Sequence, residues 1–503
     1  MEKNILFTNQ IVNYRYLNNN TIQFLDTSGN IFSKKISELG YPYIYGIPDN
    51  SKRFSDEELS HIIKTYKMNI PYITHNGIQE KIGYKLEVDE PRHIPSLRDK
   101  FTHTFEAKIP YIRRLGFDNK IIWANNVPRY ADIDIEERKG DVELIGYKDN
   151  ITNEYEPYYS VKDFIQTLEK RKILEIYAWN GQAYDFDRLA DLTDSLYFKN
   201  ILKLDAMFMY SIYQQKPPRT LNLAGKETEI GTKVIITKAF SQLTRKELET
   251  YNEQDVNIQA GVLNKLGIRD LIHYYSNYLA LHPNDIFSNE SKYNFQLRPS
   301  ATRAFDSLII RKYSPRVYLL DSYTVGQKVS YEGGFVLEPE KGIYYNIASF
   351  DYNSLYPHVI MYTDFDNFVY KMVKQFEKDI YNNRLDFKKQ YKITNNRMYD
   401  TGQQALKILI NSLYGIFANP YFRYFNSPTA EHITAQARYQ VKKLIQLIQS
   451  LGYKIVYADT DSCFVYNIIK SDAEKLADIL NKELNPFEVK LEKFYPKALF
   501  FGE

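Results

Sequence analysis

Two aspartates lie two positions apart in the stretch KIVYADTDSCFVYN, residues 454–467. The runs on either side, 454–458 and 463–466, are rich in β-branched and aromatic residues and predict two strands. The four residues between them, Asp-Thr-Asp-Ser, are turn formers, so the stretch predicts a β-hairpin with Asp459 and Asp461 at its tip. Such a tip is usually only a turn. Carboxylates elsewhere in the chain must decide whether this one holds a cation.

A second acidic group begins in RYADIDIEERKGDVELIGY. Alternate residues of a strand share a face, so Asp134 and Glu136 point to one side, and Asp132 shares that face and could replace either in the assignment. Further candidates are Asp185, which follows an apolar run, and Asp255, on an expected helix with Tyr251 one turn earlier. Clustered carboxylates repel each other by about 4 kcal/mol per pair at an effective dielectric of 20. Two Mg²⁺ ions would relieve that repulsion and support hydrolysis, with the Tyr251 phenol orienting the attacking water.

A third group combines acids with phosphate-binding side chains. Asp351 closes an expected strand in NIASFDYNSLYPHVI, and Pro357 suits the first turn of the helix that follows. In GQQALKILINSLYGIFANP, a helix places three polar side chains within about 60° of one another, namely Lys407, Asn411 and Tyr414. Arg384 and Lys388 are four residues apart on another expected helix. Several cationic donors on two helices suit a triphosphate, and with two Mg²⁺ ions on Asp351 and Asp461 the set fits phosphoryl transfer to a hydroxyl.

The chain that must position these residues has 503 amino acids, which predicts two to four domains. A net charge of +3 requires any nucleic-acid surface to be a local groove. One cysteine excludes an internal disulfide and a cysteine-rich zinc site. The sequence has no long apolar stretch and no signal-peptide pattern, so we expect a soluble cytoplasmic protein without membrane contact, in the bacterial host cytoplasm if the source is viral.

The pattern of elements predicts a multidomain fold of α/β and α+β parts. Short alternating runs indicate a mostly β region over 1–128, and alternating strand and helix patterns indicate an α/β domain over 129–267. A helical connection is expected over 268–330. The remaining segments are expected to form a sheet-containing domain in two parts, 331–366 and 416–503, separated by helices over 367–415.

Six ordered motifs resemble those of the family B DNA polymerases. DYNSLYP, KILINSLYG and YADTDS are similar to the family's three polymerase motifs, and DIDIE, WNGQAYDFD and YNEQDV to its three exonuclease motifs. YEGG at 331–334 resembles the segment between the two activities. The resemblance covers about residues 105–503 and is closest to the T-even phage branch. It implies a ribonuclease-H-like exonuclease domain over 129–267, a palm over 331–366 and 416–503, and short fingers over 367–415.

The resemblance also implies roles for the candidate residues. Asp351 and Asp461 would bind both polymerase metals, with Asp459 contributing charge nearby. The ring of Tyr356 would pack under the sugar and exclude a 2′-hydroxyl. The triphosphate would be bound by Arg384, Lys388, Lys407 and Asn411. Two further Mg²⁺ ions would be held by the exonuclease ligands, Asp134, Glu136, Asp185 and Asp255.

The expected activity is therefore DNA synthesis from dNTPs on primer-template DNA, with 3′→5′ proofreading and a sliding clamp as a further partner. The chain ends VKLEKFYPKALFFGE, where the family continues into a Lys-Lys-x-Tyr segment and a thumb. This ending predicts the large piece of a split polymerase, completed by a second polypeptide. The alternatives are an enzyme active only as a 3′→5′ exonuclease because the thumb is missing, and a non-catalytic scaffold.

Overall fold

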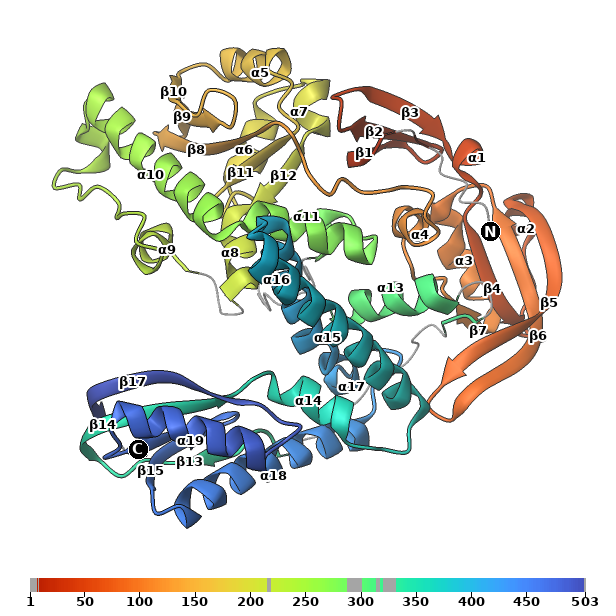
Figure 1. Ribbon diagram of the computed structural model, residues 1–503. Helices are drawn as coiled ribbons and strands as arrows, with labels where there is room; N and C mark the ends of the chain where they lie inside the picture. The colour runs from red at the N-terminus through yellow and green to blue at the C-terminus, as the bar shows by residue number, and fades with distance from the viewer. Residues whose placement is uncertain are drawn as a thin grey trace. The chain divides into compact units, whose positions relative to one another are not determined.

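The computed structural model of the 503-residue chain describes residues 7, 9–214, 219–286, 301–313, 317–319 and 332–501. Two compact units make up the chain, and their strands and helices are labelled in Figure 1. The first unit comprises 1–72, 80–321 and 383–409, and the second comprises 73–79, 322–382 and 410–503. The six-part division expected from the sequence stays a prediction.

The amino-terminal part of the first unit has two antiparallel sheets, with strand orders β1-β2-β3 and β5-β6-β4-β7. Trp123, Phe24 and Ile22 belong to the apolar cluster under the first of these sheets. The elements are β1 (Ile11–Asn18), β2 (Thr21–Asp26), β3 (Ile31–Lys35), α1 (Ile36–Leu39), β4 (Tyr43–Pro48), α2 (Asp56–Ser60), β5 (Ile62–Thr74), β6 (Gly77–Val88), η1 (Pro91–His93), α3 (Ile94–Arg98), β7 (Phe101–Phe105) and α4 (Tyr111–Phe117).

A mixed five-stranded sheet with the order β10-β9-β8-β11-β12 follows in the same unit. Strand β8 pairs antiparallel with β9 and parallel with β11, which in turn pairs parallel with β12. The sheet elements are β8 (Tyr130–Arg138), β9 (Asp141–Asp149), β10 (Tyr155–Tyr158), β11 (Glu175–Ala178) and β12 (Leu202–Asp205). The helices of this region are α5 (Val161–Lys170), α6 (Asp185–Asp191), α7 (Leu196–Asn200), α8 (Ala206–Gln214), α9 (Leu221–Glu227), η2 (Phe240–Gln242), α10 (Arg245–Leu266), α11 (Ile268–Leu279), α12 (Pro283–Ile286) and α13 (Ala301–Tyr313).

Helix α10 has clear start and stop signals. Thr244 and Glu247 form a reciprocal capping box at its first turn, which satisfies two backbone N–H groups that have no partner within the helix. Gly267 ends the helix at φ 66°, a left-handed conformation that glycine adopts without steric cost. These signals fix the length of the helix on which Tyr251 and Asp255 lie.

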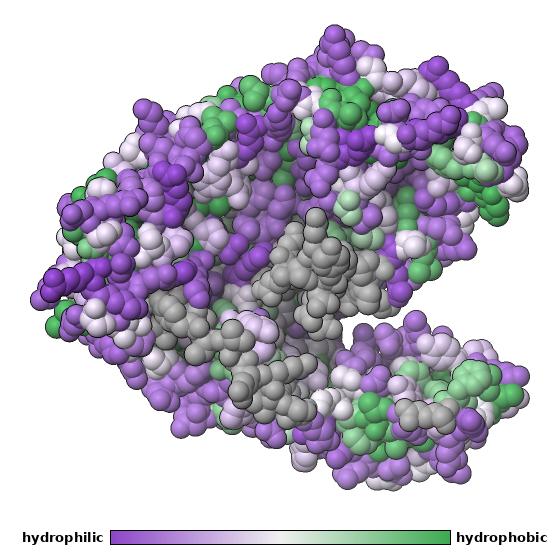
Figure 2. All heavy atoms as spheres, turned by 180° about the vertical axis from the view of Figure 1, so that it is seen from behind, coloured by the Kyte–Doolittle hydropathy of each residue, from purple (hydrophilic) through white to green (hydrophobic). Residues whose placement is uncertain are grey.

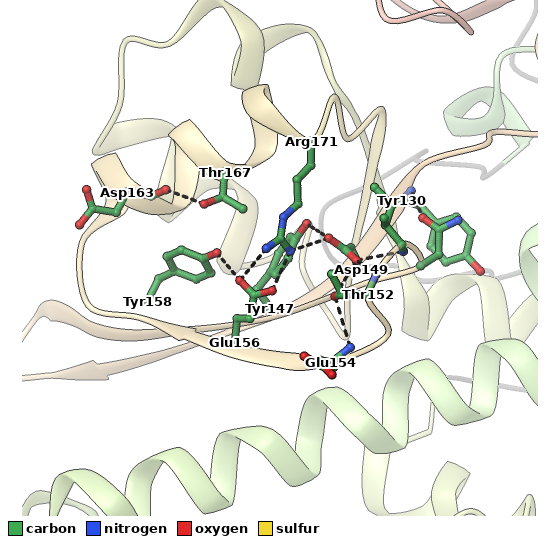
Figure 3. A network of polar contacts seen from close by, with 12 residues as sticks. Tyr130, Tyr147, Asp149, Thr152, Glu154, Glu156, Tyr158, Asp163, Thr167 and Arg171 are labelled. Carbon is green, nitrogen blue, oxygen red and sulfur yellow. Dashed lines mark hydrogen bonds and ion pairs between the residues drawn. The ribbon is translucent and has the colours of Figure 1, made fainter.

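A polar network ties the edge of this sheet to helix α5 (Figure 3). The Arg171 guanidinium donates to Asp149 at 2.7 Å and to Glu156 at 3.0 Å, and the Tyr147 hydroxyl donates to Asp149 at 2.6 Å. Burial alone would raise the pKa of Asp149, but bonds from Tyr147, the Thr152 backbone and Arg171 lower this pKa to about 2. The ionised carboxylate therefore fixes the β9–β10 connection.

The second unit is built on an antiparallel sheet with the order β13-β15-β16-β14-β17. Strand β14 pairs with β16 on one side and with the long strand β17 on the other. Its elements are β13 (Val336–Leu337), β14 (Gly342–Tyr352), α14 (Leu355–Tyr362), α17 (Gly415–Ala418), α18 (Ser427–Ser450), β15 (Lys454–Asp459), β16 (Ser462–Tyr466), α19 (Lys470–Glu483) and β17 (Val489–Phe500).

Two long helices run through both units, α15 (Phe368–Thr394) and α16 (Arg397–Leu413). They pack closely where Gly402 faces Phe387, since a Cβ at position 402 would lie 2.6 Å from the phenyl ring. Apolar residues of α16 such as Leu409 are fully buried, as its amphipathic pattern predicts.

Hydrophilic side chains cover most of the face shown in Figure 2, with smaller hydrophobic areas among them. Within the described ranges, no helix has both the length and the apolar character needed to cross a membrane.

Candidate active sites

Three carboxylates converge on one face of the mixed sheet in the first unit. Asp134 and Glu136 lie on β8, and Asp255 lies on α10, which packs against that strand. One ligand oxygen of each lies within 4.8 Å of the others. This confirms that alternation along the strand brings Asp134 and Glu136 together, and it identifies Asp255 as the helical member of the group.

Asn252 holds the two strand carboxylates in place, and the sequence analysis did not identify it. Its Nδ2 donates to Oδ2 of Asp134 at 2.9 Å and, more weakly, to Glu136 at 3.4 Å. A Cβ at Gly146, which pairs with Asp134 across β8 and β9, would lie only 1.7 Å from Oδ1 of Asn252. Glycine at 146 therefore makes the room that the amide needs. One turn separates Asn252 from Asp255 on α10, and that spacing was the available signal.

Asp185 lies at the first residue of α6, and its Oδ1 accepts the backbone N–H of Ile135 at 3.1 Å. It is close enough to raise the pKa of Asp134, but it is not one of the three residues whose ligand atoms lie within 4.8 Å. The structure therefore places Asp185 beside the group and bonded to the strand.

Asp132 does not join the group. Its carboxylate binds Nη2 of Arg269 through both oxygens at 2.6 Å and accepts from Gln259 at 2.9 Å. Because Asp132 is neutralised by a buried arginine from α11, it serves the packing of that helix on the sheet. The alternative assignment that exchanges Asp132 for Asp134 or Glu136 is thus unsupported by the geometry.

Burial and mutual repulsion disfavour the charged forms of these carboxylates. The pKa of Asp134 lies well above its usual value because of burial and the charges of Glu136, Asp185 and Asp255. Burial raises the pKa of Glu136 to about 7, with Asp255 adding to the effect, and burial raises the pKa of Asp185 to about 6. Oxygen Oδ1 of Asp255 is buried without a hydrogen-bond partner among the described residues. A divalent cation, whose preferred ligands are carboxylate oxygens, fits this set.

One positively charged side chain, Lys233, lies beside these carboxylates. Nζ of Lys233 is 2.5 Å from Oδ2 of Asp255 and donates to the Tyr251 hydroxyl at 3.2 Å. Burial raises the pKa of Asp255, and its contacts with Lys233 and Tyr251 offset part of that rise. Lys233 lies in the loop after α9, outside any helix or strand, so no periodicity pointed to it. Its position at the start of the apolar run Lys-Val-Ile-Ile was the one local signal.

In the second unit, the predicted acidic hairpin is confirmed. Strands β15 and β16 pair antiparallel with Asp459 opposite Ser462, and Thr460 and Asp461 form the turn. Thr460 has φ 52°, and its backbone N–H binds Phe335 O at 2.8 Å. A Cβ at Gly334 would lie 2.7 Å from Oγ1 of Thr460, so this part of the YEGG segment approaches the turn closely. Tyr331 of that segment lies outside the described residues.

Asp351 lies next to this turn. It pairs with Ser462 across β14 and β16, and the N–H of Tyr352 donates to Asp461 O at 2.9 Å. Burial and the charges of Asp351 and Asp459 raise the pKa of Asp461 to about 6. Lys490 of β17, another residue that the sequence analysis missed, lies 3.5 Å from Asp351. Asp351, Asp459 and Asp461 do not form a group within 4.8 Å among the described residues, unlike the first set.

The candidate nucleotide-binding residues lie on α14, α15 and α16, except Tyr414, which directly follows α16. Arg384 is buried on α15, whereas Lys388 and, on α16, Lys407 and Asn411 are half-buried. Arg384, Lys388 and Lys407 belong to the first unit, and Asn411 belongs to the second.

Two candidate aromatic residues of the second unit contact each other. The ring of Tyr356 on α14 lies 5.1 Å from the ring of Tyr414, the residue that precedes α17. The structure therefore brings together the two rings that the sequence analysis placed at the nucleotide.

Comparison with known proteins finds similarity to one family. A family model described as DNA polymerase family B matches residues 295–396 and 378–501. DNA polymerase 1 of Pyrococcus abyssi is 22% identical over 91% of this chain and 72% of its own length. The carboxyl-terminal two fifths of the chain is thus similar to DNA polymerase family B. The DNA polymerase of Archaeoglobus fulgidus is 31% identical, over 35% of this chain and 26% of its own length.

The fold is also similar to that of a solved structure. The structure of the family B DNA polymerase from the archaeon Pyrobaculum calidifontis matches with a TM-score of 0.74 at 17% identity, over 98% of this chain and 78% of that chain. The expected multidomain α/β and α+β fold class is thereby confirmed. The chain spans about a quarter of the Archaeoglobus protein and nearly three quarters of the Pyrococcus protein.

Proposed function

We propose that this chain is a family B DNA-directed DNA polymerase that adds dNTPs to a primer 3′ end and removes mispaired ends by 3′→5′ exonuclease action. The observation that supports it most is the presence of two separate carboxylate sites at the motif positions of the family. One is the group on β8 and α10 in the first unit, and the other joins β14 to the hairpin turn in the second.

Mg²⁺ is the proposed cofactor, with two ions at each site. The ions would be held by Asp134, Glu136, Asp185 and Asp255 in the first unit and by Asp351 and Asp461 in the second. Bound Mg²⁺ would neutralise the carboxylates and supply electrostatic stabilisation of the reacting phosphate. The raised pKa values of Asp134 and Asp461 support this proposal, because burial and neighbouring carboxylates disfavour their charged forms and a bound cation would relieve that repulsion.

For degradation, the chain supplies a cation and a phenol beside Asp255. Lys233 offsets part of the negative charge that the carboxylates and the DNA phosphate bring together. Its bond to the Tyr251 hydroxyl orients that group, which would position the attacking water. Asn252 keeps Asp134 and Glu136 in their relative positions.

For synthesis, the side chains of α15 and α16 would bind the triphosphate. Arg384, Lys388, Lys407 and Asn411 offer several donors to phosphate oxygens. The Tyr356 ring, supported by contact with Tyr414, would pack against the deoxyribose and exclude a 2′-hydroxyl. Asp459 would add negative charge beside Asp461.

A second candidate function is exonuclease action without synthesis. The tighter spacing of the carboxylates in the first unit favours it, since those ligands already lie within 4.8 Å while the second set does not. The T-even phage affinity, the second polypeptide with a Lys-Lys-x-Tyr segment and the sliding clamp stay predictions.

Primer extension and primer degradation, assayed side by side with Mg²⁺, test both candidates. Asp461→Asn should abolish nucleotide addition and leave degradation of a single-stranded 3′ end nearly intact, because a neutral amide cannot replace a carboxylate between two cations. The double change Asp134→Ala with Glu136→Ala should have the opposite effect. Synthesis by Asp461→Asn within tenfold of the parent would exclude the assignment of the hairpin. Degradation without any synthesis by the parent would favour the exonuclease alone.

A further inference from the structure

Two histidines and an aspartate meet in the amino-terminal part of the first unit, apart from both proposed active sites. His61 lies between α2 and β5, Asp89 directly follows β6, and His93 is the last residue of η1. Their ligand atoms, one from each residue, lie within 4.8 Å of one another. The sequence analysis gave no role to any of the three, because 28 residues separate His61 from Asp89.

Both imidazoles face the same carboxylate through the same ring atom. Nδ1 of His61 lies 2.9 Å from Oδ2 of Asp89, and Nδ1 of His93 lies 2.7 Å from Oδ1. The two rings are stacked, with centroids 3.5 Å apart and planes inclined by 24°. Two imidazole nitrogens and a carboxylate therefore border one small volume.

Backbone bonds hold this arrangement in place. The N–H of Asp89 donates to His61 O at 3.0 Å, which joins the ends of β5 and β6. The N–H of Glu90 donates to Oδ1 of Asp89 at 2.7 Å, and the N–H of His93 donates to Glu90 O at 3.2 Å. The three donors are thus positioned by the fold, and little ordering is needed before a ligand binds.

The donor set matches one class of ion. Two imidazole nitrogens and one carboxylate oxygen form a common three-residue set for Zn²⁺, which leaves a fourth position for water. Tetrahedral Zn²⁺ at ~2.0–2.1 Å from its ligands would space them by ~3.3 Å, so the carboxylate would withdraw by about 0.5 Å. The side chains of His61, Asp89 and His93 are 27%, 31% and 14% exposed, so the fourth position has access to solvent.

We propose that His61, Asp89 and His93 bind a divalent transition-metal ion of the zinc class. Imidazole donors favour such an ion over Mg²⁺, which prefers oxygen ligands and keeps several waters. The bound ion would link the start of β5, the end of β6 and η1, and so stabilise the four-stranded sheet. The ion would take the place of the two Nδ1 protons that otherwise bond to the Asp89 carboxylate. Because protons and the ion compete for the same nitrogens, the affinity for the ion falls as the solution is acidified.

The experiment is a Zn²⁺ titration of the full chain by calorimetry in excess Mg²⁺. The Asp134→Ala, Glu136→Ala, Asp461→Asn background removes ligands of both proposed active sites, which could also bind Zn²⁺. In this background we expect one Zn²⁺ per chain. His93→Gln and Asp89→Asn should each lower the affinity for Zn²⁺ by about a hundredfold or more. His103→Gln, a change on β7 of the same sheet, is the matched control and should leave binding unchanged.

A melting experiment provides the second measurement. Zn²⁺ should raise the melting temperature of the parent and of His103→Gln, but not that of His93→Gln. The proposal fails if, in the background that lacks ligands of both active sites, Zn²⁺ binds equally tightly with and without His93→Gln, or if it does not bind at all. If His93→Gln does not fold, His61→Gln and Asp89→Asn decide by the same criteria. Zn²⁺ binding that all three variants retain would place the ion elsewhere.

Discussion

The ammonium group of Lys233 contacts two groups of α10 at once, the Asp255 carboxylate and the Tyr251 hydroxyl. A positive charge at this distance stabilises the ionised carboxylate and lowers the pKa of Asp255 relative to what burial alone would give. The pKa of Glu136 is lowered by the same charge. Lys233 therefore controls the pH at which the carboxylate group can accept a cation.

We expect Lys233→Met to reduce 3′-end degradation by roughly ten- to a hundredfold near neutral pH, in the range of a lost charged hydrogen bond. The pH profile should also move to higher pH, because the carboxylates lose the charge that favours their ionised forms. Lys238→Met is the matched control, since Lys238 pairs with Glu247 on the exposed side of the same region. Equal pH profiles for parent and Lys233→Met would contradict this role.

The contact between the rings of Tyr356 and Tyr414 leads to a prediction about sugar selection. We expect Tyr356→Ala to incorporate ribonucleotides far better than the parent, by a factor of about a hundred or more, because the ring would no longer meet a 2′-oxygen. Tyr356→Phe retains the ring and should retain the preference. The measurement is the ratio of kcat/KM for dATP and ATP, and an unchanged ratio in Tyr356→Ala would assign the discrimination to another residue.

At the scale of elements, short-range patterns predicted the strands and helices better than they predicted the contacts between them. The alternation in 130–138 and the turn residues 459–462 were sufficient to predict β8 and the β15–β16 hairpin. The same alternation placed Asp132 with Asp134, but Asp132 binds Arg269, a residue 137 positions away. Only the packing of α11 against the sheet determines that contact. Lys233 and Asn252 were missed for the same reason, since their roles depend on what another element brings near them.

Before α12, His282 provides a pH-sensitive link to strand β1. Its Nε2 lies 3.1 Å from Oδ1 of Asn13, and its ring contacts Tyr14 and Trp123. Burial lowers the pKa of His282 from 6.5 to about 4. Because the native state resists protonation, the unfolded state binds more protons between pH 6.5 and 4, and stability falls as the pH falls through this window.

We therefore expect the free energy of unfolding to decrease by up to about 3 kcal/mol from this group between pH 6.5 and 4, since each pKa unit corresponds to about 1.4 kcal/mol. His282→Gln should be less stable at pH 7 but should show a shallower dependence over the same window. Urea unfolding at several pH values measures both quantities. A slope in His282→Gln as steep as in the parent would exclude His282 as the cause.

At the scale of the whole molecule, each compact unit has one sheet that carries a set of candidate carboxylates. The fold class could be predicted from the sequence, because the pattern of elements and the ordered motifs can be read along the chain. The sequence did not predict which segments make up each unit. Segment 73–79 belongs to the second unit although the residues before and after it belong to the first. Segment 383–409 belongs to the first unit although its sequence neighbours belong to the second. The reason is that β5, β6, α15 and α16 each have residues in both units.

Removal of divalent metal should abolish both activities, and readdition of Mg²⁺ should restore both. With Asp134→Ala and Glu136→Ala, Mg²⁺ should restore synthesis alone, and with Asp461→Asn it should restore degradation alone. Because the pKa of Glu136 is about 7, Mg²⁺ binding near neutral pH should also release protons. Calorimetry in buffers of different ionisation enthalpy measures that release, and its persistence in the double variant would contradict the assignment.

The chain contains one cysteine, Cys463, which is fully buried on β16. Burial raises the pKa of its thiol, and the thiolate is the form that reacts with maleimides and related reagents. The native chain should therefore remain unlabelled under mild conditions. A single introduced cysteine would become the reactive position, for example Ile393→Cys near the end of α15, where the side chain is 68% exposed. A fluorophore placed there would follow this helix pair during nucleotide addition without any prior removal of native thiols.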